Sequence, residues 1–463
     1  MGVFGAINTA VSGLRAQAFA LENISGNIAN SQTTGFKRQD TSFAELVSDT
    51  GSSQRLQNSG SVLASSRATN DIQGNIVGAD QETFIAIQGD GYFAVRDASG
   101  LNNGEPIFNG PELYTRAGDF QISNSGFLQN GAGLFLSGFP ISSTGGGVDT
   151  LIAQPIQIST DPISPVATSE INFRANLPIN PDTAVSTDGD AASGLLDATL
   201  LAGGTAGPAT ISNAEETAFL NTTIAGGTTT VLDPRGEAVN VEFRFAKTDS
   251  SDPAVGGDDI YNLYFRSNSD GVTEPAFTRV AQDYIFGPDG QLDPQITPVV
   301  IPGFSVDGLN IGDLTLDAGS SGFTQVATQS GVGTVSNTSI SSNGSPLGSF
   351  SGVSISDSGN VSISYTNGAN LDIARISIAT FDNDSGLERV DGGGTFAATV
   401  ASGVPITDSS AGGTIIGSAL EASNTDIADE FTKLIVTQQA YTANSRIITT
   451  GDEILTEAIN LIR

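Results

Sequence analysis

The C-terminal stretch of the chain, residues 420–463, carries an apolar residue at every seventh position. The repeat falls at Leu420, Ile427, Leu434, Tyr441, Ile448, Leu455 and Ile462, and the stretch contains no proline. A repeat of this period keeps one stripe of a slightly underwound helix facing a partner, and proline is the residue that would interrupt such a helix. The sequence therefore predicts one long helix that begins at Leu420 and packs against another helix.

The seam of this predicted helix is narrow. A two-helix seam also uses the position four residues after each repeat residue. Of these positions, Phe431 and Ile459 are apolar and the others are polar. Gly451 adds a weak point, because Gly costs about 1 kcal/mol relative to Ala inside a helix. Such a seam is typical of a helix that contacts several partners lightly, although a hairpin packed inside one monomer explains it equally well.

The N-terminal residues carry a second apolar stripe, with alternating spacings of three and four. It comprises Phe4, Ile7, Val11, Leu14, Ala18, Leu21, Ser25 and Ile28. Because neither stripe can bury itself alone, we expect the terminal helices to pair in a coiled coil and to present their remaining apolar surface to other copies. Asn23, Asn27 and Asn30 flank this stripe. A solvated face would explain them, but three Asn within eight residues of a helix, which Asn disfavours, also indicate specific hydrogen bonds.

Composition excludes several classes of function. The chain has 463 residues with a formal net charge of −32, which argues against nucleic acid and anionic membranes as partners. It contains no Cys and no His, which excludes thiolate nucleophiles, imidazole bases and His-ligated metals, so we expect no enzyme, no metal and no cofactor. No apolar run approaches the length of a membrane span. Arg15 follows the N-terminal apolar run instead of preceding it, so we expect no cleavable secretion signal.

The middle of the chain is rich in Gly, Ser, Thr, Asn and Asp, a composition typical of short strands joined by tight turns. Residues 84–95 predict a hairpin around Gly89-Asp90-Gly91. Residues 239–245 alternate as a half-buried strand does, with residues 260–266 as the expected partner. Residues 353–378 predict two consecutive hairpins. The centre is therefore expected to be all-β.

These elements predict a multidomain fold in which terminal helices enclose nested all-β domains. We expect residues 1–33 and 420–463 to form a helical polymer core and residues 34–70 an extended connector. A discontinuous inner β domain is expected at residues 71–168 and 340–419. Residues 169–339 are expected to form an inserted outer β domain. Head-to-tail assembly of many copies would bring the helices together in a common centre.

Four segments resemble the signatures of bacterial flagellar rod and hook proteins. The amino-terminal signature is carried by Ser12-Gly13-Leu14, Leu21, Asn23, Ile24, Asn27, Ala29, Asn30 and Thr34-Gly35-Phe36-Lys37. The carboxyl-terminal signature is carried by Leu420-Glu421-Ala422-Ser423-Asn424, Gln438, Gln439, Ala440, Tyr441 and Asn444. Residues 86–93 and 114–120 resemble the middle motifs, and all four occur in the family's order. The resemblance covers about half of the chain.

Within that family the chain is most similar to the hook subunits, because residues 365–368 and 381–387 resemble their second β segment and because rod proteins lack so large an insertion. The likeness is weak at about 170–335 and at Asn383-Asp384, where the family usually has Pro after Asn. The resemblance implies a structural subunit, exported by the flagellar type III apparatus, that polymerises with itself under a hook cap into a curved, flexible tube outside the cell. This tube would act as a universal joint transmitting torque from rod to filament, with rod and hook-filament junction proteins as neighbours.

Two alternatives stay open at this stage. A distal rod or other axial subunit would share the same motifs. A secreted β-rich adhesin or carbohydrate-active protein would share the acidic, Gly- and Thr-rich centre, and paired carboxylates could serve glycoside hydrolysis. Sequence spacing alone does not show whether two carboxylates face each other.

Overall fold

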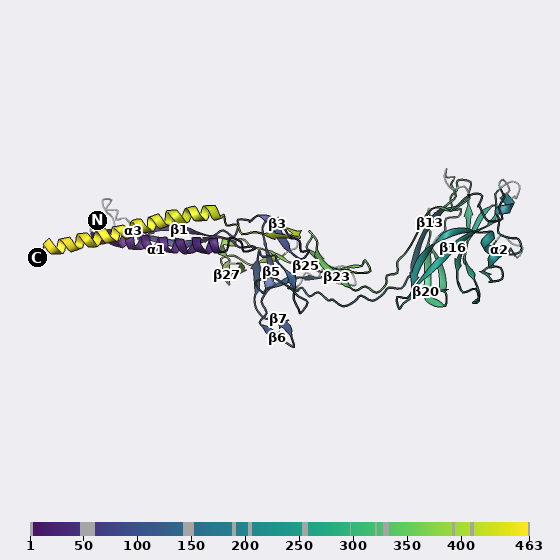
Figure 1. Ribbon diagram of the computed structural model, residues 1–463, viewed down its shortest axis with the longest axis horizontal. Coiled ribbons are helices and arrows are strands. Elements are labelled where there is room, and N and C mark those ends of the chain that lie inside the picture. Colours follow the sequence, from purple (N-terminus) through teal and green to yellow (C-terminus); the bar gives the residue numbers. More distant parts are fainter. Residues whose placement is uncertain are drawn as a thin grey trace. The chain divides into compact units, whose positions relative to one another are not determined.

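The computed structural model describes residues 3–46, 61–141, 152–187, 191–201, 206–251, 258–296, 298–319, 322–326, 333–390, 394–407 and 412–461 (Figure 1). The chain is mostly β, with a helix at each end. It divides into two compact units. The first comprises Met1–Thr160, Ser351–Ser364 and Asn370–Arg463, and the second comprises Asp161–Phe350 and Tyr365–Ala369. No helix within the described ranges is long and apolar enough to span a membrane.

In the first unit, helix α1 (Val3–Ala29) and helix α3 (Ile427–Leu461) lie side by side (Figure 1). They approach closely at two glycines. A Cβ atom on Gly13 would lie 2.9 Å from Nδ2 of Asn444, and one on Gly451 would lie 2.9 Å from Cγ1 of Ile7. Gly451, predicted as a weak point, is therefore a buried residue that lets α1 approach α3.

Helix α3 begins at Ile427, so the prediction that it begins at Leu420 is wrong. Leu420 belongs instead to strand β31 (Ala419–Glu421), which pairs antiparallel with β3 (Ile76–Gly78). The seven-residue spacing places Leu420 in phase with the helix, but pairing with β3 satisfies the backbone there in an extended form.

The N-terminus of α3 is capped by Asp426. Its Oδ1 accepts hydrogen bonds from the backbone N–H groups of Ala428, at 2.8 Å, and Asp429, at 3.2 Å. A carboxylate in this position satisfies free helical donors and interacts favourably with the helix dipole. Asp426 is therefore the N-cap residue of α3.

Residues 34–70, expected to be an extended connector, contain a two-stranded antiparallel sheet. Strand β1 (Gln39–Leu46) pairs with β2 (Ser61–Ala68), with Gln39 opposite Ala68 and Phe43 opposite Ala64. Both strands lie against α1. The N-terminal helix is thus covered by α3 and by this sheet.

The main sheet of the first unit brings together strands from distant parts of the chain. Its order is β23 (Phe350–Ile355), β24 (Asn360–Tyr365), β25 (Asn370–Ile376), β11 (Phe135–Pro140), β5 (Tyr92–Arg96), β8 (Glu112–Thr115), β28 (Thr395–Ala397), β27 (Glu388–Val390), with β9 (Gln121–Ile122), β10 (Leu128–Gln129), β12 (Gln154–Pro155), β26 (Ile378–Thr380) and β29 (Ile406–Thr407) off this path. The neighbouring positions of β23, β24 and β25 confirm the two hairpins predicted there. Part of the core of this sheet is an aromatic cluster around Tyr92, Tyr114 and Phe396.

The hairpin predicted at residues 84–95 is wrong. Strand β4 (Ile85–Gln88) pairs with β30 (Thr414–Gly417), whereas β5 pairs with β8. Gly89 and Gly91 do turn the chain with positive φ. The turn separates the two strands because the first three residues of β4 are buried and the strand takes its partner from a segment more than 300 residues away. A smaller hairpin, β6 (Gly100–Asn102) with β7 (Glu105–Ile107), follows β5.

The second unit contains two sheets around one core. One sheet has β19 (Val299–Val306), β20 (Leu309–Asp317), β13 (Glu170–Asn176), β21 (Phe323–Thr324) and β22 (Ser336–Ser342); the other has β14 (Thr210–Ile211), β18 (Phe277–Phe286), β17 (Asp259–Arg266), β16 (Ala238–Asp249) and β15 (Ile224–Leu232). Rings of Phe173, Phe245 and Phe323 from both sheets contact one another. Pairing of β16 with β17 confirms the predicted strand pair. A short helix, α2 (Glu216–Asn221), completes the unit.

Candidate functional site

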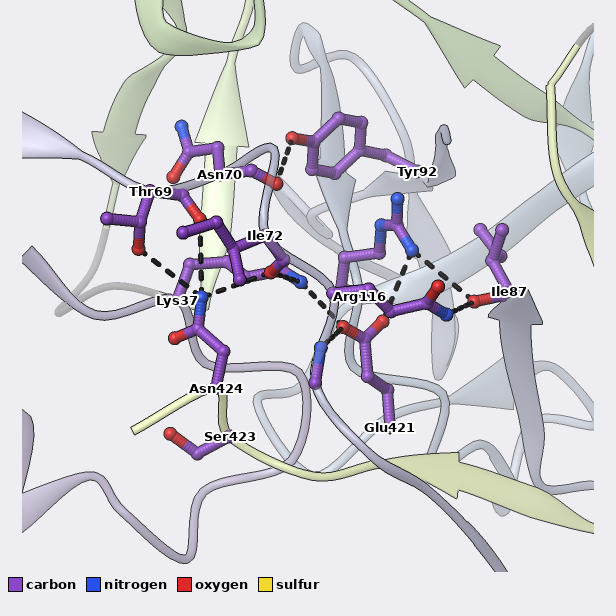
Figure 2. Close-up of polar contacts among 12 residues, drawn as sticks. Lys37, Thr69, Asn70, Ile72, Ile87, Tyr92, Arg116, Glu421, Ser423 and Asn424 are labelled. Carbon is purple, nitrogen blue, oxygen red and sulfur yellow. Dashed lines mark hydrogen bonds and ion pairs between the residues drawn. The ribbon is translucent and has the colours of Figure 1, made fainter. Parts of the chain in front are cut away.

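The four motifs found in the sequence meet in one buried junction of the first unit (Figure 2). Glu421, from the carboxyl-terminal motif, lies at its centre. The backbone N–H of Gly35 donates to the backbone oxygen of Glu421 at 2.8 Å, which joins the two terminal motifs. Lys37 and Arg116 reach the Glu421 side chain from the amino-terminal motif and from the second middle motif. Segments that are hundreds of residues apart are therefore held at one point.

The Glu421 carboxylate bridges two cations. Lys37 Nζ lies 2.5 Å from its Oε1, and Arg116 Nη1 lies 3.2 Å from its Oε2. The side chains of Lys37, Glu421 and Arg116 are 1%, 0% and 4% exposed. The backbone N–H of Gly74 donates to Oε1 as well, at 2.8 Å. A buried charge is tolerated only when it is paired and hydrogen-bonded, and this carboxylate meets both conditions.

The Lys37 ammonium is fully enclosed. Besides Glu421 it donates to the backbone oxygen of Ile72 at 2.7 Å. Burial lowers the pKa of Lys37, because desolvation penalises the charged form, and the Glu421 carboxylate opposes that shift. The Lys37 side chain therefore depends on the Glu421 carboxylate to stay protonated in this buried site.

Arg116 carries the junction into the first middle motif. Its Nη2 donates to the backbone oxygen of Gly89 at 2.8 Å, and its guanidinium lies 5.2 Å from the centre of the Tyr92 ring. The planar guanidinium can stack on an aromatic face while it hydrogen-bonds at its edge. Arg116 thus ties β5 and the turn after β4 to Glu421.

Asn424 fixes the segment that leads into α3. Its Oδ1 accepts a hydrogen bond from the backbone N–H of Arg38 at 2.7 Å. Its Nδ2 donates to the backbone oxygens of Ile72 at 3.0 Å and Thr69 at 3.2 Å (Figure 2). One amide group therefore bridges two stretches of backbone, one at Arg38 and one at residues 69–72. The direction in which the chain enters α3 is set by these bonds.

The motif residues between α1 and Lys37 pack tightly. Gly35 has φ +68° and is buried, and a Cβ atom there would overlap the backbone of Arg116 and Ala117. Phe36 is buried, with the Arg389 guanidinium 5.5 Å from its ring centre. Thr34 is half-buried. The Gly at position 35 is required by both its backbone conformation and the close approach.

The asparagines of the N-terminal motif have separate roles. Asn27, which is 2% exposed, exchanges two hydrogen bonds of 2.9 Å with the backbone of Gln39 and donates to Glu430 Oε2 at 3.0 Å. Asn23 donates to Oγ1 of Thr41 at 2.9 Å. Asn30 donates to the backbone oxygen of Gly26 within α1. Asn27 therefore joins α1, β1 and α3.

The apolar residues predicted for the helix seam differ in their exposure. On α1, Phe4 is 74% exposed, and Ile7, Val11, Leu14, Leu21 and Ile28 are half-buried. On α3, Leu434, Ile448 and Leu455 are half-buried, whereas Ile427, Phe431 and Tyr441 are exposed; Ile462 lies outside the described residues. The fully buried residues of α1 are Ala10, Ala16, Ala20, Ile24 and Asn27.

Sequence reasoning missed the buried contacts that Glu421, Arg116 and Glu430 make. Each of these residues lies inside or beside a recognised motif. Their partners are far away in the sequence, however, and a contact between distant residues leaves no local pattern. Glu430 is buried and accepts a hydrogen bond from Lys433 at 2.8 Å in addition to the bond from Asn27. Within the described ranges, no group of three His, Cys, Asp or Glu residues is placed to hold a metal ion.

Three families of known proteins match parts of the chain. The family described as "Flagella basal body rod protein" matches residues 7–37, "Flagellar hook protein FlgE/F/G D1 domain" matches residues 86–187, and "Flagellar basal body rod FlgEFG protein C-terminal" matches residues 416–461. The first and last matches contain the two ends of the junction, and the middle match contains Arg116.

Curated relatives match along the whole length. The "Flagellar hook protein FlgE" of Brucella suis biovar 1 (strain 1330) is 29% identical over 468 residues, covering all of both chains. The "Flagellar hook protein FlgE" of Escherichia coli (strain K12) is 27% identical, and the match covers 98% of this chain and the full length of that relative. Among solved structures, a crystal structure of the Helicobacter pylori flagellar hook protein FlgE2 covers 75% of this chain and all of its own, at 15% identity and a TM-score of 0.49.

Proposed function

Since the chain belongs to the flagellar hook protein family and is a structural subunit of the hook, we propose that its terminal helices pair as a coiled coil in the inner core of a homopolymer. The predicted seam residues of α1 and α3 are the proposed contacts within this core. Those that the pair itself leaves uncovered, such as Phe4 and Phe431, would be covered by neighbouring copies.

The observation that carries this proposal is the apolar surface that the helix pair leaves exposed. Ile435, Val436, Ile454 and Ile459 of α3 are between 51% and 64% exposed. Apolar side chains in such numbers on one helix mark an interaction surface. Burying them between copies would stabilise a polymer by roughly 1.5–3 kcal/mol for each side chain that is fully covered.

The distribution of charge favours the same arrangement. The chain has a net charge of −32, but α1 carries only Arg15 and Glu22, whose formal charges cancel. Copies of α1 can therefore approach one another without strong repulsion, whereas the acidic remainder keeps other surfaces apart. This supports a place for α1 at the centre of the polymer.

The buried junction would make the inner core and the main sheet of the first unit one mechanical element. Torque applied to the helices would pass through Glu421, Lys37 and Arg116 to the sheet instead of being lost in a flexible connector. We propose that residues 71–168 and 340–419 act as the inner β domain and residues 169–339 as an outer domain that slides as the tube bends. The polymer would then work as a universal joint between rod and filament.

The remaining expectations stand as parts of the same proposal. The chain would leave the cell through the flagellar type III export apparatus without a cleavable signal. It would then assemble outside the cell under a hook cap, with rod and hook-filament junction proteins at its two ends. Family membership supports these partners through the functions of the relatives.

Electron microscopy of the full-length protein in a salting-out buffer, which strengthens apolar association, tests the polymer. We expect curved tubes of uniform diameter. Ile435→Asp, which adds a charge to the exposed helix face, should prevent tubes without unfolding the monomer. Leu101→Asp is a matched control, because Leu101 is 73% exposed on the β6–β7 hairpin. Straight tubes would favour the distal rod alternative, and monomers under all conditions, with cap protein present, would contradict the proposal.

A further inference from the structure

We propose that a groove between α1 and α3 receives the Phe4 side chain of a second copy of this chain, which links subunits laterally around the tube. The inference deepens the proposed function and rests on the proposed homopolymer. It assigns one donor residue and one acceptor groove to the contact between neighbours.

The groove lies at the end of the helix pair where α1 begins. It is lined by Val3, Ala6 and Ile7 of α1 and by Ile447, Gly451 and Ile454 of α3, with a volume of about 420 Å³. Ile447 and Ile454 are 46% and 51% exposed although they line a concave surface. A groove with such walls gains free energy when an apolar side chain replaces its water.

The depth of the groove depends on Gly451. It is buried, and a Cβ atom there would lie 2.9 Å from Cγ1 of Ile7. Any larger residue would fill the floor of the groove or separate the two helices. The same glycine that lets α1 approach α3 therefore also leaves the space into which a side chain can insert.

Phe4 has the properties of the inserting residue. With 74% of its surface exposed, it is the most exposed of the large apolar side chains on the described parts of the two helices. A large aromatic side chain in a desolvated pocket is the usual source of most of the binding energy at an interface. Phe4 lies at the same end of α1 as the groove between α1 and α3, so each copy carries both halves of the contact.

The direction of the contact follows from the helix geometry. At 3.6 residues per turn, Phe4 lies about 60° to one side of Ile7, whereas Ala6 lies about 100° to the other side. Phe4 and the groove thus face opposite flanks of α1. A contact between two different surfaces does not close on itself as a two-fold dimer does, so it can continue from copy to copy. Because Phe4 and the groove are at the same end of the helices, the neighbouring copy would lie at a similar position along the tube axis.

Charge favours a second copy as the occupant. The one charged side chain that lines the groove is Arg446, and α1 brings no charge within two turns of Phe4. The N-terminal turn of α1 offers an apolar tip with no charged side chain, and such a tip fits the apolar walls of the groove.

Disulfide cross-linking tests the inference cleanly, because the chain has no cysteine of its own. Phe4→Cys and Ile454→Cys variants are prepared separately and mixed. They are assembled in the salting-out buffer at a protein concentration above the one that Phe4→Ala requires, and are then oxidised. We expect a disulfide-linked heterodimer that forms only in the mixture and only in the polymer. Thr456→Cys replaces Ile454→Cys in the control, because Thr456 is exposed on the same turns of α3 but does not line the groove.

Phe4→Ala and Phe4→Leu provide a second measurement. We expect Phe4→Ala to raise the protein concentration needed for assembly by roughly tenfold or more, and Phe4→Leu to raise it much less. Tubes that form normally but give no more Phe4–Ile454 cross-link than the Thr456 control would overturn this inference and leave the proposed function standing. Failure of the unmodified chain to form any polymer would overturn both.

Discussion

The Nζ atom of Lys37 lies 2.5 Å from Oε1 of Glu421, although 384 residues separate them along the chain. Arg116 binds the other oxygen of the same carboxylate. The two ends of the chain are thereby fixed to the sheet between them through one side chain. Because all three groups are buried, the loss of Glu421 would leave two cations without a counter-charge.

We expect Glu421→Ala to destabilise the first unit by about 3–5 kcal/mol, because it leaves Lys37 and Arg116 buried without a counter-charge. Denaturant unfolding of the monomer measures this change. Glu388→Ala is the matched control, since Glu388 is exposed on β27 and its substitution should change stability by less than about 0.5 kcal/mol. An equal, small effect of both substitutions would show that Glu421 does not hold the junction.

The pairwise energy of Lys37 and Glu421 can be separated from their individual contributions. We expect the double variant Lys37→Met with Glu421→Gln to be more stable than the sum of the single effects implies, by about 0.5–3 kcal/mol. The reason is that Lys37→Met removes the cation that Glu421→Gln would otherwise leave unpaired. Additive effects in this double-mutant cycle would mean that the two side chains do not interact.

Gly35→Ala should destabilise the junction strongly. Ala is strained at φ +68°, and its Cβ atom would overlap the backbone of Arg116 and Ala117. Gly104→Ala separates the two causes, because Gly104 has φ +90° but no atom near the position of a Cβ. We expect the control to cost about 1–2 kcal/mol and Gly35→Ala clearly more, as measured by thermal unfolding. Equal costs would assign the whole effect to backbone strain.

The sequence was sufficient to predict the terminal helices and several strand pairs, because these depend on local spacing. The seven-residue repeat marks α3, and alternation marks β16. The sequence was not sufficient where the structure of a segment depends on pairing with a strand from a distant part of the chain. Leu420 continues the helical repeat but pairs with β3, and the turn at Gly89 separates two strands that take their partners elsewhere.

The junction could be recognised as important from the sequence, but its chemistry could not be derived. The motifs contain Lys37, Arg116 and Glu421, yet nothing in their spacing shows that three ionised groups, usual on surfaces, are buried together. The seam was read from large apolar residues, whereas the closest approach of α1 to α3 uses Gly13 and Gly451. Small residues give no periodic signal that separates them from surface positions.

Asn27→Asp should destabilise the helix pair more than Asn27→Ala. The alanine variant loses bonds to Gln39 and Glu430 and should cost about 1–3 kcal/mol. The aspartate variant also places a second carboxylate where Asn27 now donates to Glu430 Oε2 at 3.0 Å, and like charges repel strongly in a buried site. Helix content followed by circular dichroism during thermal unfolding measures both, with Asn30→Ala as the nearly neutral control. A milder effect of aspartate than of alanine would contradict the contact.

Buried tyrosines should make the protein unfold at alkaline pH. Burial raises the pKa of Tyr92, Tyr114, Tyr261, Tyr264 and Tyr284, because desolvation disfavours the phenolate. Unfolded tyrosines lose their protons near pH 10. Above that pH the folded state binds more protons than the unfolded state, so the free energy of unfolding falls as pH rises. The chain has seven tyrosines and no tryptophan, so tyrosinate absorbance near 295 nm reports them directly. Most of the increase in this absorbance should coincide with the loss of β structure.

Tyr284 Oη has no hydrogen-bond partner among the described residues, so Tyr284→Phe should remove one group from this step without lowering stability at neutral pH. A complete increase near pH 10 in a chain that remains folded would contradict the burial of these side chains.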